Sequence, residues 1–154
     1  MIELVEKSDA RLAVWLSSMW AEYHADLLAA GMSDEEADKN VERNRATLLD
    51  GERSATGQHI LDIVSDKAVV GTLWLGHHPN QGPHEWFIYD IVIDEEHRSK
   101  GLGRATMLAA EEFVKTKSGT RLGLNVFGTN TIARQLYESL DYQVMSLAMF
   151  KDFM

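Results

Sequence analysis

Residues 94–104 decide the fold of this chain and read Asp-Glu-Glu-His-Arg-Ser-Lys-Gly-Leu-Gly-Arg. The segment before them, 85–94, is almost continuously apolar and rich in β-branched and aromatic residues, which is typical of a strand covered on both faces. From residue 102 to about 117, apolar side chains recur at helical spacing. The quoted stretch therefore joins a buried strand to the start of a helix.

This loop has the composition of an anion-binding site. The start of a helix presents unpaired N–H groups and partial positive charge, and glycines let those groups approach an anion closely. Arg98, Lys100 and Arg104 add positive charge beside Gly101 and Gly103. The loop suits a pyrophosphate. The alternative is a surface turn that happens to contain two glycines.

Two other phosphate-binding motifs are excluded by spacing. A dinucleotide fingerprint needs a third small residue where Thr106 stands, a short glycine-led turn, and an acid at the end of the following strand. That strand ends in Val126-Phe127-Gly128, so the fingerprint is absent. A P-loop is excluded too, because no Gly-Lys-Ser/Thr follows at the required spacing.

The rest of the chain predicts one α+β (α/β) domain, a mixed central β-sheet flanked by helices, over residues 1–154. The expected order is α-α-β-β-β-α-β-α-β. A capping box, Ser33 to Glu36, opens the second helix, and Asp66-Lys67 forms a hairpin turn. The predicted helices are 10–30, 33–49, 102–117 and 131–140, and the predicted strands are 58–65, 68–76, 85–94, 121–127 and 142–150.

Net charge and the absence of cysteine limit the classes of partner and of chemistry that we expect. The chain has 24 acidic and 15 basic residues, a formal charge of −9. Residues 1–100 carry −10 of this and residues 101–154 carry +1. Such acidity argues against nucleic acid and anionic membranes as partners. Without cysteine there is no disulfide or thiolate nucleophile, and we expect a cytoplasmic protein. His77, His78 and His84 are expected to be solvent-exposed in a loop, with no metal site.

A second motif follows the strand 121–127. It is the pattern of an amphipathic helix that carries a tyrosine. Its residues are Asn130, Ala133, Leu136, Tyr137, Glu138, Leu140 and Tyr142. Together with Arg98-x-x-Gly101-x-Gly103, this motif resembles the GNAT superfamily of acetyl-CoA-dependent N-acetyltransferases. The resemblance covers about residues 71–150. Residues 1–50 match only in their two helices, the region that varies with the acceptor in this superfamily. The family usually has Gly where Asp141 stands, and Asp tolerates the left-handed conformation expected there.

The resemblance implies a GNAT-like acyl-CoA N-acyltransferase fold that uses acetyl-CoA as co-substrate and no metal. The pantetheine arm is expected in a wedge between the strands 85–94 and 121–127, and the pyrophosphate on the loop amides. The implied cofactor-binding residues are Ile91, Val92, Ile93, Arg98, Ser99, Lys100, Gly101, Leu102, Gly103, Arg104 and Asn130.

Two residues of the second motif have alternative roles. Asn130 precedes a helix and can act as its N-cap, and the resemblance adds a bond to the CoA arm. Tyr137 can pack in the core, or, as the resemblance implies, reach the thioester sulfur as general acid. A phenol with a pKa of about 10 stays protonated at neutral pH and matches a thiolate in basicity. A backbone N–H near Ile93 is the expected oxyanion donor.

The general base is less defined. Some family members have Glu on the strand before the loop, where this chain has Tyr89. The nearby titratable groups are Glu85, Asp90 and His84. In a regular strand Glu85 shares a face with Tyr89, and Asp90 points the other way. Glu85 is therefore the first candidate for the base and Asp90 the second, with a water held by backbone groups as an equal alternative.

The leading functional hypothesis is acetyl transfer to a primary amine on a small molecule, peptide or protein, by direct attack in a ternary complex. Alternatives are a catalytically silent acyl-CoA-binding or regulatory module, another acyl chain, or a hydroxyl acceptor. The acidic first half favours a cationic amine. Trp20, Tyr23 and His24 are candidates to line the acceptor pocket. A homodimer is an open alternative to a monomer.

Overall fold

The computed structural model describes residues 1–50, 53–54, 57–78 and 81–153. They form two compact units, Met1–Leu124 and Asn125–Met154, and each is described by itself. A single domain over 1–154, with a helical region 1–50 and a motif-bearing region 71–150, stays a prediction. No helix in the described ranges combines the length and apolar character that a membrane span requires.

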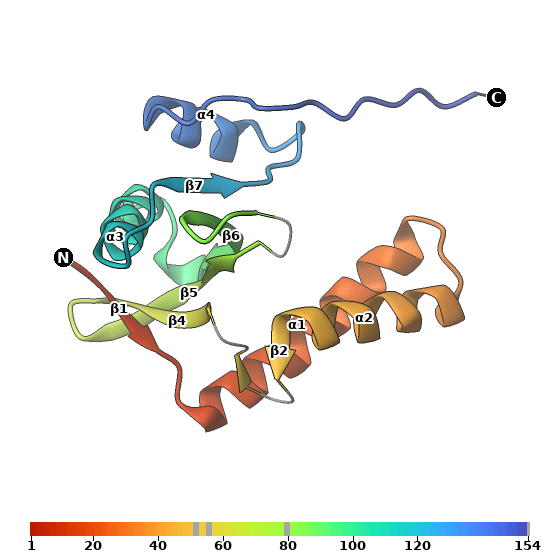
Figure 1. The fold of residues 1–154 in the computed structure, drawn as a ribbon, viewed down its shortest axis with the longest axis horizontal. Coiled ribbons are helices and arrows are strands. Elements are labelled where there is room, and N and C mark those ends of the chain that lie inside the picture. The colour runs from red at the N-terminus through yellow and green to blue at the C-terminus, as the bar shows by residue number, and fades with distance from the viewer. Residues whose placement is uncertain (51–52, 55–56, 79–80, 154) are drawn as a thin grey trace. The chain divides into compact units, whose positions relative to one another are not determined.

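A five-stranded mixed sheet organises the first unit (Figure 1). The strand order is β1-β4-β5-β6-β7, antiparallel throughout except for the parallel pair β6 and β7. This confirms the predicted mixed sheet. The strands are β1 (Ile2–Glu6), β4 (Gln58–Ser65), β5 (Ala68–His77), β6 (Glu85–Ile93) and β7 (Arg121–Leu124). A separate two-stranded ribbon pairs β2 (Leu49–Asp50) with β3 (Arg53–Ser54).

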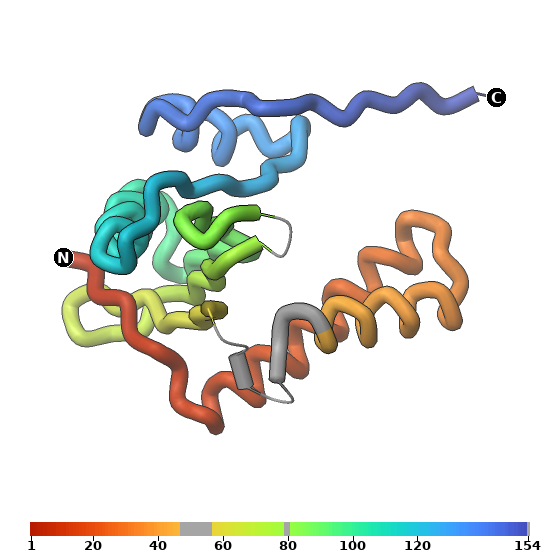
Figure 2. Tube along the Cα trace, in the orientation of Figure 1, coloured from red at the N-terminus to blue at the C-terminus, as the bar shows by residue number. Residues whose placement is uncertain are grey.

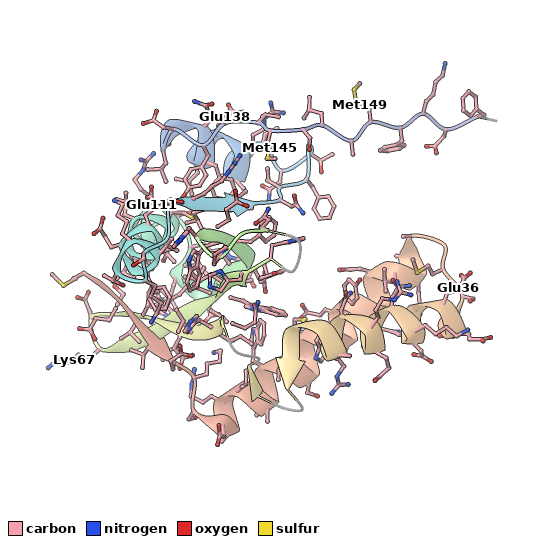
Figure 3. The ribbon with its side chains drawn as sticks, in the orientation of Figure 1. Glu36, Lys67, Glu111, Glu138, Met145 and Met149 are labelled. Atoms are coloured by element: carbon pink, nitrogen blue, oxygen red, sulfur yellow. The ribbon has the colours of Figure 1, made fainter. Side chains whose placement is uncertain are left out.

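The predicted hairpin between β4 and β5 is confirmed. Asp66 and Lys67 both have positive φ, 49° and 65°, which are the values of a two-residue turn that matches the twist of its strands. Figure 3 labels Lys67 at this turn.

Two long helices, α1 (Asp9–Ala29) and α2 (Asp34–Leu48), form an antiparallel pair (Figure 2). The predicted capping box is present at the start of α2. The Glu36 amide donates to Ser33 Oγ at 3.2 Å, and the Ser33 amide donates to a Glu36 carboxylate oxygen at 3.1 Å. Figure 3 shows Glu36 at this end of the pair.

The two faces of the sheet carry different helices. Trp74 on β5 belongs to one core cluster with Leu12 and Leu16 of α1. The opposite face packs on α3 (Leu102–Thr116), whose Phe113 ring lies 6.2 Å from the Trp86 ring of β6. We call these the α1 face and the α3 face. The loop residues 94–101 run from the end of β6 to the start of α3 and include a short turn, η1 (Glu95–His97).

Strand β1 is absent from the sequence-based assignment. It is five residues long and pairs only with β4, in register Ile2↔Ser65 to Glu6↔Leu61. A short edge strand has one neighbour, so its sequence needs little of the apolar character that marks a central strand. The expected order therefore lacked its first element.

The second unit contains α4 (Thr131–Ser139) and an extended C-terminal segment. Asp141 has φ 69°, and the Tyr142 amide donates to the Tyr137 carbonyl at 3.0 Å, so α4 ends in the left-handed cap expected there. The prediction of a strand over 142–150 is wrong, because these residues have no ladder partner in the described chain. Met145 and Met149, labelled in Figure 3, are 80% and 88% exposed along this segment.

Candidate active site

Strands β6 and β7 diverge halfway along β6. Their parallel register runs from Glu85↔Arg121 to Ile88↔Leu124, where β7 ends, three residues earlier than predicted. Strand β6 continues to Ile93, so among the described residues of the first unit 89–93 pair on the β5 side only. Unpaired backbone groups along a strand can bond an extended ligand. The structure thus places Ile91, Val92 and Ile93 on an open strand edge, and Val92 is 38% exposed.

A β-bulge lies at the point where this edge opens. Opposite β5, the register passes from Leu75↔Ile88 to Trp74↔Asp90, which leaves Tyr89 as the extra residue. Because Asp90 is the cross-strand partner of Trp74, it lies on the α1 face. Tyr89 packs against Trp74 as well, with ring centroids 5.2 Å apart. The expectation that Tyr89 and Asp90 point to opposite faces is therefore wrong, because the bulge breaks the alternation.

The loop after β6 presents backbone amides at the start of α3. Gly101 is the N-cap in the left-handed region, with φ 76°, and Ser99 is also left-handed, with φ 63°. No side chain caps the helix in the described chain, and the first turn contains no acid. The Ala105 amide bonds back to the Gly101 carbonyl, and helix geometry leaves the amides of Leu102 and Gly103 before it without a helical acceptor, so they can bind an anion. This geometry fits a phosphate group.

The basic side chains of the loop have different placements. Arg98 Nε donates to the Ile93 carbonyl at 2.8 Å and so ties the loop to the end of β6. Lys100 Nζ lies 3.5 Å from the Glu96 carbonyl, and Arg104 is exposed on the first turn of α3. Arg98 thus has a structural role that the sequence did not indicate, whereas direct phosphate contact by any of the three stays a prediction.

Asn130 and Tyr137 both lie on or next to α4 in the second unit. The Ala133 amide donates to Asn130 Oδ1 at 3.3 Å, which confirms Asn130 as the N-cap. Tyr137 is half-buried, and its ring lies 6.2 Å from that of Tyr142. Seven residues separate Asn130 from Tyr137, about two helical turns along one side. Their contacts with CoA stay predictions.

The two candidate bases have different surroundings. Glu85 Oε1 lies 3.8 Å from Arg121 Nη1 at the start of β6. Asp90 lies at the opened end of β6, where burial raises the pKa of its carboxyl. The negative charge of Glu22 on α1 raises that pKa further, while a hydrogen bond with the Ile91 backbone lowers it. Only Asp90 therefore combines the open strand edge with a pKa shifted toward that of a general base.

An aromatic cluster surrounds Asp90 on the α1 face, and the sequence reading did not identify it as a group. Trp74 is 4% exposed and lies between two half-buried rings, Trp15 at 5.9 Å and Tyr89 at 5.2 Å. Phe87 continues the cluster, 5.2 Å from Tyr89, and His78 lies 5.5 Å from Phe87. Phe87 and Tyr89 share a face by regular alternation, and the bulge adds Asp90 to that face.

The three residues suggested for the acceptor pocket, Trp20, Tyr23 and His24, have structural contacts. Trp20 is buried in the core, Asn44 Nδ2 of α2 donates to Tyr23 Oη at 2.8 Å, and His24 Nε2 pairs with Asp38 of α2 at 2.9 Å. These three residues link α1 to α2. Their place in the acceptor pocket stays a prediction.

The loop histidines also have backbone and ring contacts. His77 Nδ1 lies 3.3 Å from the Glu85 carbonyl, and His84 Nδ1 lies 3.0 Å from the Ser118 carbonyl. His77 and His78 are half-buried, so the expectation of exposed histidines holds only for His84. In the part of the chain that the structure describes, no three His, Cys, Asp or Glu residues are grouped to hold a metal ion.

Two curated proteins are similar to this chain. The uncharacterized N-acetyltransferase YycN of Bacillus subtilis (strain 168) is 33% identical over 88 residues, 57% of this chain and 56% of that protein. The chain thus spans a little over half the length of this relative. The uncharacterized N-acetyltransferase YdgE of the same organism is 28% identical over 120 residues, 77% of this chain and 76% of that protein.

Solved structures share the fold. A crystal structure of YycN has a TM-score of 0.84 at 26% identity and covers 100% of this chain and 99% of its own. AAC(6')-Iy, in complex with the bisubstrate analog CoA-S-monomethyl-acetylneamine, has a TM-score of 0.60 at 14% identity, covering 100% of this chain and 99% of its own. At that identity the second likeness shows the fold alone.

A family model extends the likeness through the strand edge, the loop and α4. The model of the acetyltransferase (GNAT) family matches residues 16–142, most of the chain. The mixed sheet and the helices around it have the architecture of the similar structures. This chain therefore belongs to the GNAT family of acetyltransferases.

Proposed function

We propose that this chain transfers an acetyl group from acetyl-CoA to a primary amine, which attacks directly while both substrates are bound. The observation that carries the proposal is the open edge of β6 beside the uncapped N-terminus of α3. An extended amide-containing arm and a pyrophosphate match these two features, and family membership supports the same pairing. The neighbour solved with a CoA-based analog is consistent with it.

The residues proposed to hold acetyl-CoA offer mainly backbone groups. Ile91, Val92 and Ile93 would bond the pantetheine arm, and the amides of residues 99–104 would bond the pyrophosphate. Left-handed Gly101 turns the chain into α3 at a φ that L-residues rarely adopt. Bound there, acetyl-CoA supplies an acyl group activated as a thioester.

Asp90 is the proposed general base. An alkylammonium with a pKa of about 10.4 is neutral in only about one molecule in 10³ at pH 7, so a base must remove a proton before attack. The raised pKa of Asp90 makes its carboxylate a better proton acceptor than an ordinary aspartate. Glu85 is a weaker candidate, because it lies beside Arg121 at the other end of β6.

Tyr137 is the proposed general acid. In the balanced step, the amine nitrogen forms a bond to the acetyl carbon, the carbon–sulfur bond breaks, and the Tyr137 hydroxyl donates its proton to the sulfur. The ammonium loses two protons: the first goes to Asp90 before attack, and the second, released from nitrogen as the amide forms, returns to the Tyr137 phenolate. The Ile93 amide, or its neighbour, is the proposed donor to the carbonyl oxygen as negative charge develops.

Thiol release from acetyl-CoA with a panel of amines tests the proposal. The wild-type protein should turn over at least one primary amine, and Tyr137→Phe should lose most of kcat while binding acetyl-CoA unchanged. Tyr142→Phe, which removes the neighbouring phenol, is the matched control. Acetyl-CoA binding without turnover of any amine would instead favour a silent acyl-CoA-binding module. Unchanged turnover in Tyr137→Phe would exclude Tyr137 as the acid.

A further inference from the structure

One side of helix α1 faces the aromatic cluster and ends in an acid. Trp15, Met19 and Glu22 follow each other at spacings of four and three, so they form a single stripe along the helix. Trp15 and Met19 pack against the core cluster that contains Trp74. Glu22, one turn further along, is exposed and close enough to Asp90 to raise the pKa of its carboxyl. Two carboxylates therefore flank the same group of rings.

The rings between these carboxylates are held in place by hydrogen bonds. Trp74 Nε1 donates to Gln58 Oε1 at 3.0 Å, and Gln58 Nε2 donates to the His77 carbonyl at 2.8 Å. The same carbonyl accepts from Tyr89 Oη at 2.9 Å. A cation near a preset aromatic face is attracted without first ordering the ring.

The basic side chains near the N-terminus of α1 form ion pairs with a different acid. Lys7 and Arg11 both pair with Asp62 on β4. Among the residues that the structure describes, no lysine or arginine forms an ion pair with Glu22 or Asp90. The rings thus lie between two acids whose charge the first unit does not itself neutralise.

We propose that the acceptor is a diamine or polyamine, with a second ammonium group bound over Trp15 and Tyr89 and balanced by Glu22. This inference rests on the proposed function and names its substrate class. The reacting nitrogen gives its proton to Asp90, so Asp90 ends the step neutral and does not balance a further positive charge. Glu22 remains charged beside the rings, and a second ammonium on the acceptor satisfies it. A monoamine leaves Glu22 without a counter-charge.

A matched pair of acceptors measures the contribution of the second ammonium. Pentylamine and the diaminopentane with an amine at each end have the same five-carbon chain and differ only by a hydrogen in place of the second amine. We expect kcat/KM by thiol release to be about tenfold higher or more for the diamine, an effect typical of one ring-bound cation with a nearby carboxylate. Equal kcat/KM for the two acceptors would overturn the inference.

Variants assign the preference to the proposed residues. Glu22→Gln should lower kcat/KM for the diamine toward that of pentylamine, with little change for pentylamine itself. Trp15→Leu should reduce the ratio of the two kcat/KM values. The control is Asp66→Asn, which removes one negative charge at the β4–β5 turn, where Asn adopts the left-handed φ equally well. It should leave both acceptors unchanged. If Asp66→Asn and Glu22→Gln lowered kcat/KM for the diamine equally, net charge alone would explain the preference for the diamine, and the inference would be wrong.

A binding measurement separates this inference from the proposed function. The diamine or pentylamine is added to the protein in the presence of CoA that carries no acetyl group. Binding is followed by tryptophan fluorescence, to which Trp15 and Trp74 contribute. Tighter binding of the diamine that Glu22→Gln abolishes supports the inference even where no thiol is released. Thiol release with equal binding and equal turnover of the two amines supports the function and rejects the diamine acceptor.

Discussion

Two aspartates on the α1 face of the sheet differ in their ion pairing and in the direction of their pKa shifts. Asp62 on β4 accepts two hydrogen bonds from Arg11, at 2.8 and 3.0 Å, and pairs with Lys7, whose side chain is 4% exposed. Asp90 on β6 has a backbone partner and a nearby acid, Glu22. Burial favours a higher pKa for both carboxyl groups. In Asp62 the hydrogen bonds with Arg11 and Lys7 outweigh burial and lower the pKa. In Asp90 burial dominates and raises the pKa. Ion pairing thus makes one acid structural, and its lack leaves the other with a raised pKa, as the proposed general base requires.

The largest effect that separates the two acids is expected from Asp90→Asn. An amide cannot accept the proton of the amine, so kcat/KM should fall by about 10²- to 10⁴-fold, the range of general base catalysis. The free energy of unfolding should stay the same or rise, since a desolvated carboxylate is removed. Thiol release and urea unfolding measure the two quantities. Glu85→Gln is the matched control and should retain activity; the reverse result would assign the base to Glu85.

Substitution of Asp62 should have the opposite pattern. Asp62→Asn leaves Lys7 and Arg11 without their carboxylate. Because the Arg11 side chain is 51% exposed, this loss should cost about 1 to 3 kcal/mol in unfolding free energy. We expect kcat to persist in the protein that remains folded. Urea unfolding beside activity per folded molecule checks this. Glu112→Gln, which removes an exposed pair with Lys115, is the control and should cost less than about 1 kcal/mol.

The pH dependence of stability should differ in sign between the two acids. Asp62 has a lowered pKa in the folded state, so its contribution is complete above the unfolded value of about 3.9 and is lost as the pH falls through the folded pKa. Asp90 has a raised pKa, so its carboxylate destabilises the fold above that pKa, and protonation at lower pH relieves the cost.

Unfolding curves at several pH values for wild type, Asp62→Asn and Asp90→Asn test these signs. Asp62→Asn should show a weaker loss of stability in acid, and Asp90→Asn should show a stronger one. Activity of the wild type should fall as the pH drops through the Asp90 pKa. If Asp90 is the base, activity should fall at low pH in the same way in wild type and in Glu85→Gln. Absence of this fall in Glu85→Gln would contradict the assignment to Asp90.

The smallest effect is expected from Tyr89→Phe. The variant keeps the ring beside Trp74 and loses the hydrogen bond from Tyr89 Oη to the His77 carbonyl, which is worth about 1 kcal/mol. Thermal unfolding should show this loss, and kcat should stay within about twofold. Because burial raises the pKa of Tyr89, its phenol is neutral near pH 7 and is not a candidate base. A large drop in kcat would give Tyr89 a direct part in the reaction.

Much of the fold follows from local patterns in the sequence. The apolar segment 85–94, the glycine loop and the capping box at Ser33 each depend on neighbouring residues, and the structure confirms the strand and helix starts they predict. Strand β1 and the segment 142–150 depend on partners far away in the chain, and local sequence does not report such partners.

The acceptor side of the site depends on a feature with no sequence signal. The bulge at Tyr89 contains no Gly, Pro or Asn, so regular alternation put Asp90 on the wrong face. The pairing of Lys7 and Arg11 with Asp62 joins residues more than fifty positions apart. The contrast between the two acids is therefore a property of tertiary structure.

The extra residue in β6 also affects how relatives are compared with this chain. Side chains alternate with period two along a strand, so an ungapped alignment against a protein without the bulge assigns every later β6 residue to the opposite face. The counterpart of Asp90 in a relative is then the residue opposite the equivalent of Trp74, whatever its residue count. Deletion of Tyr89 alone would restore a regular ladder in which Asp90 still lies opposite Trp74, so a relative that is one residue shorter here keeps its acid on the α1 face.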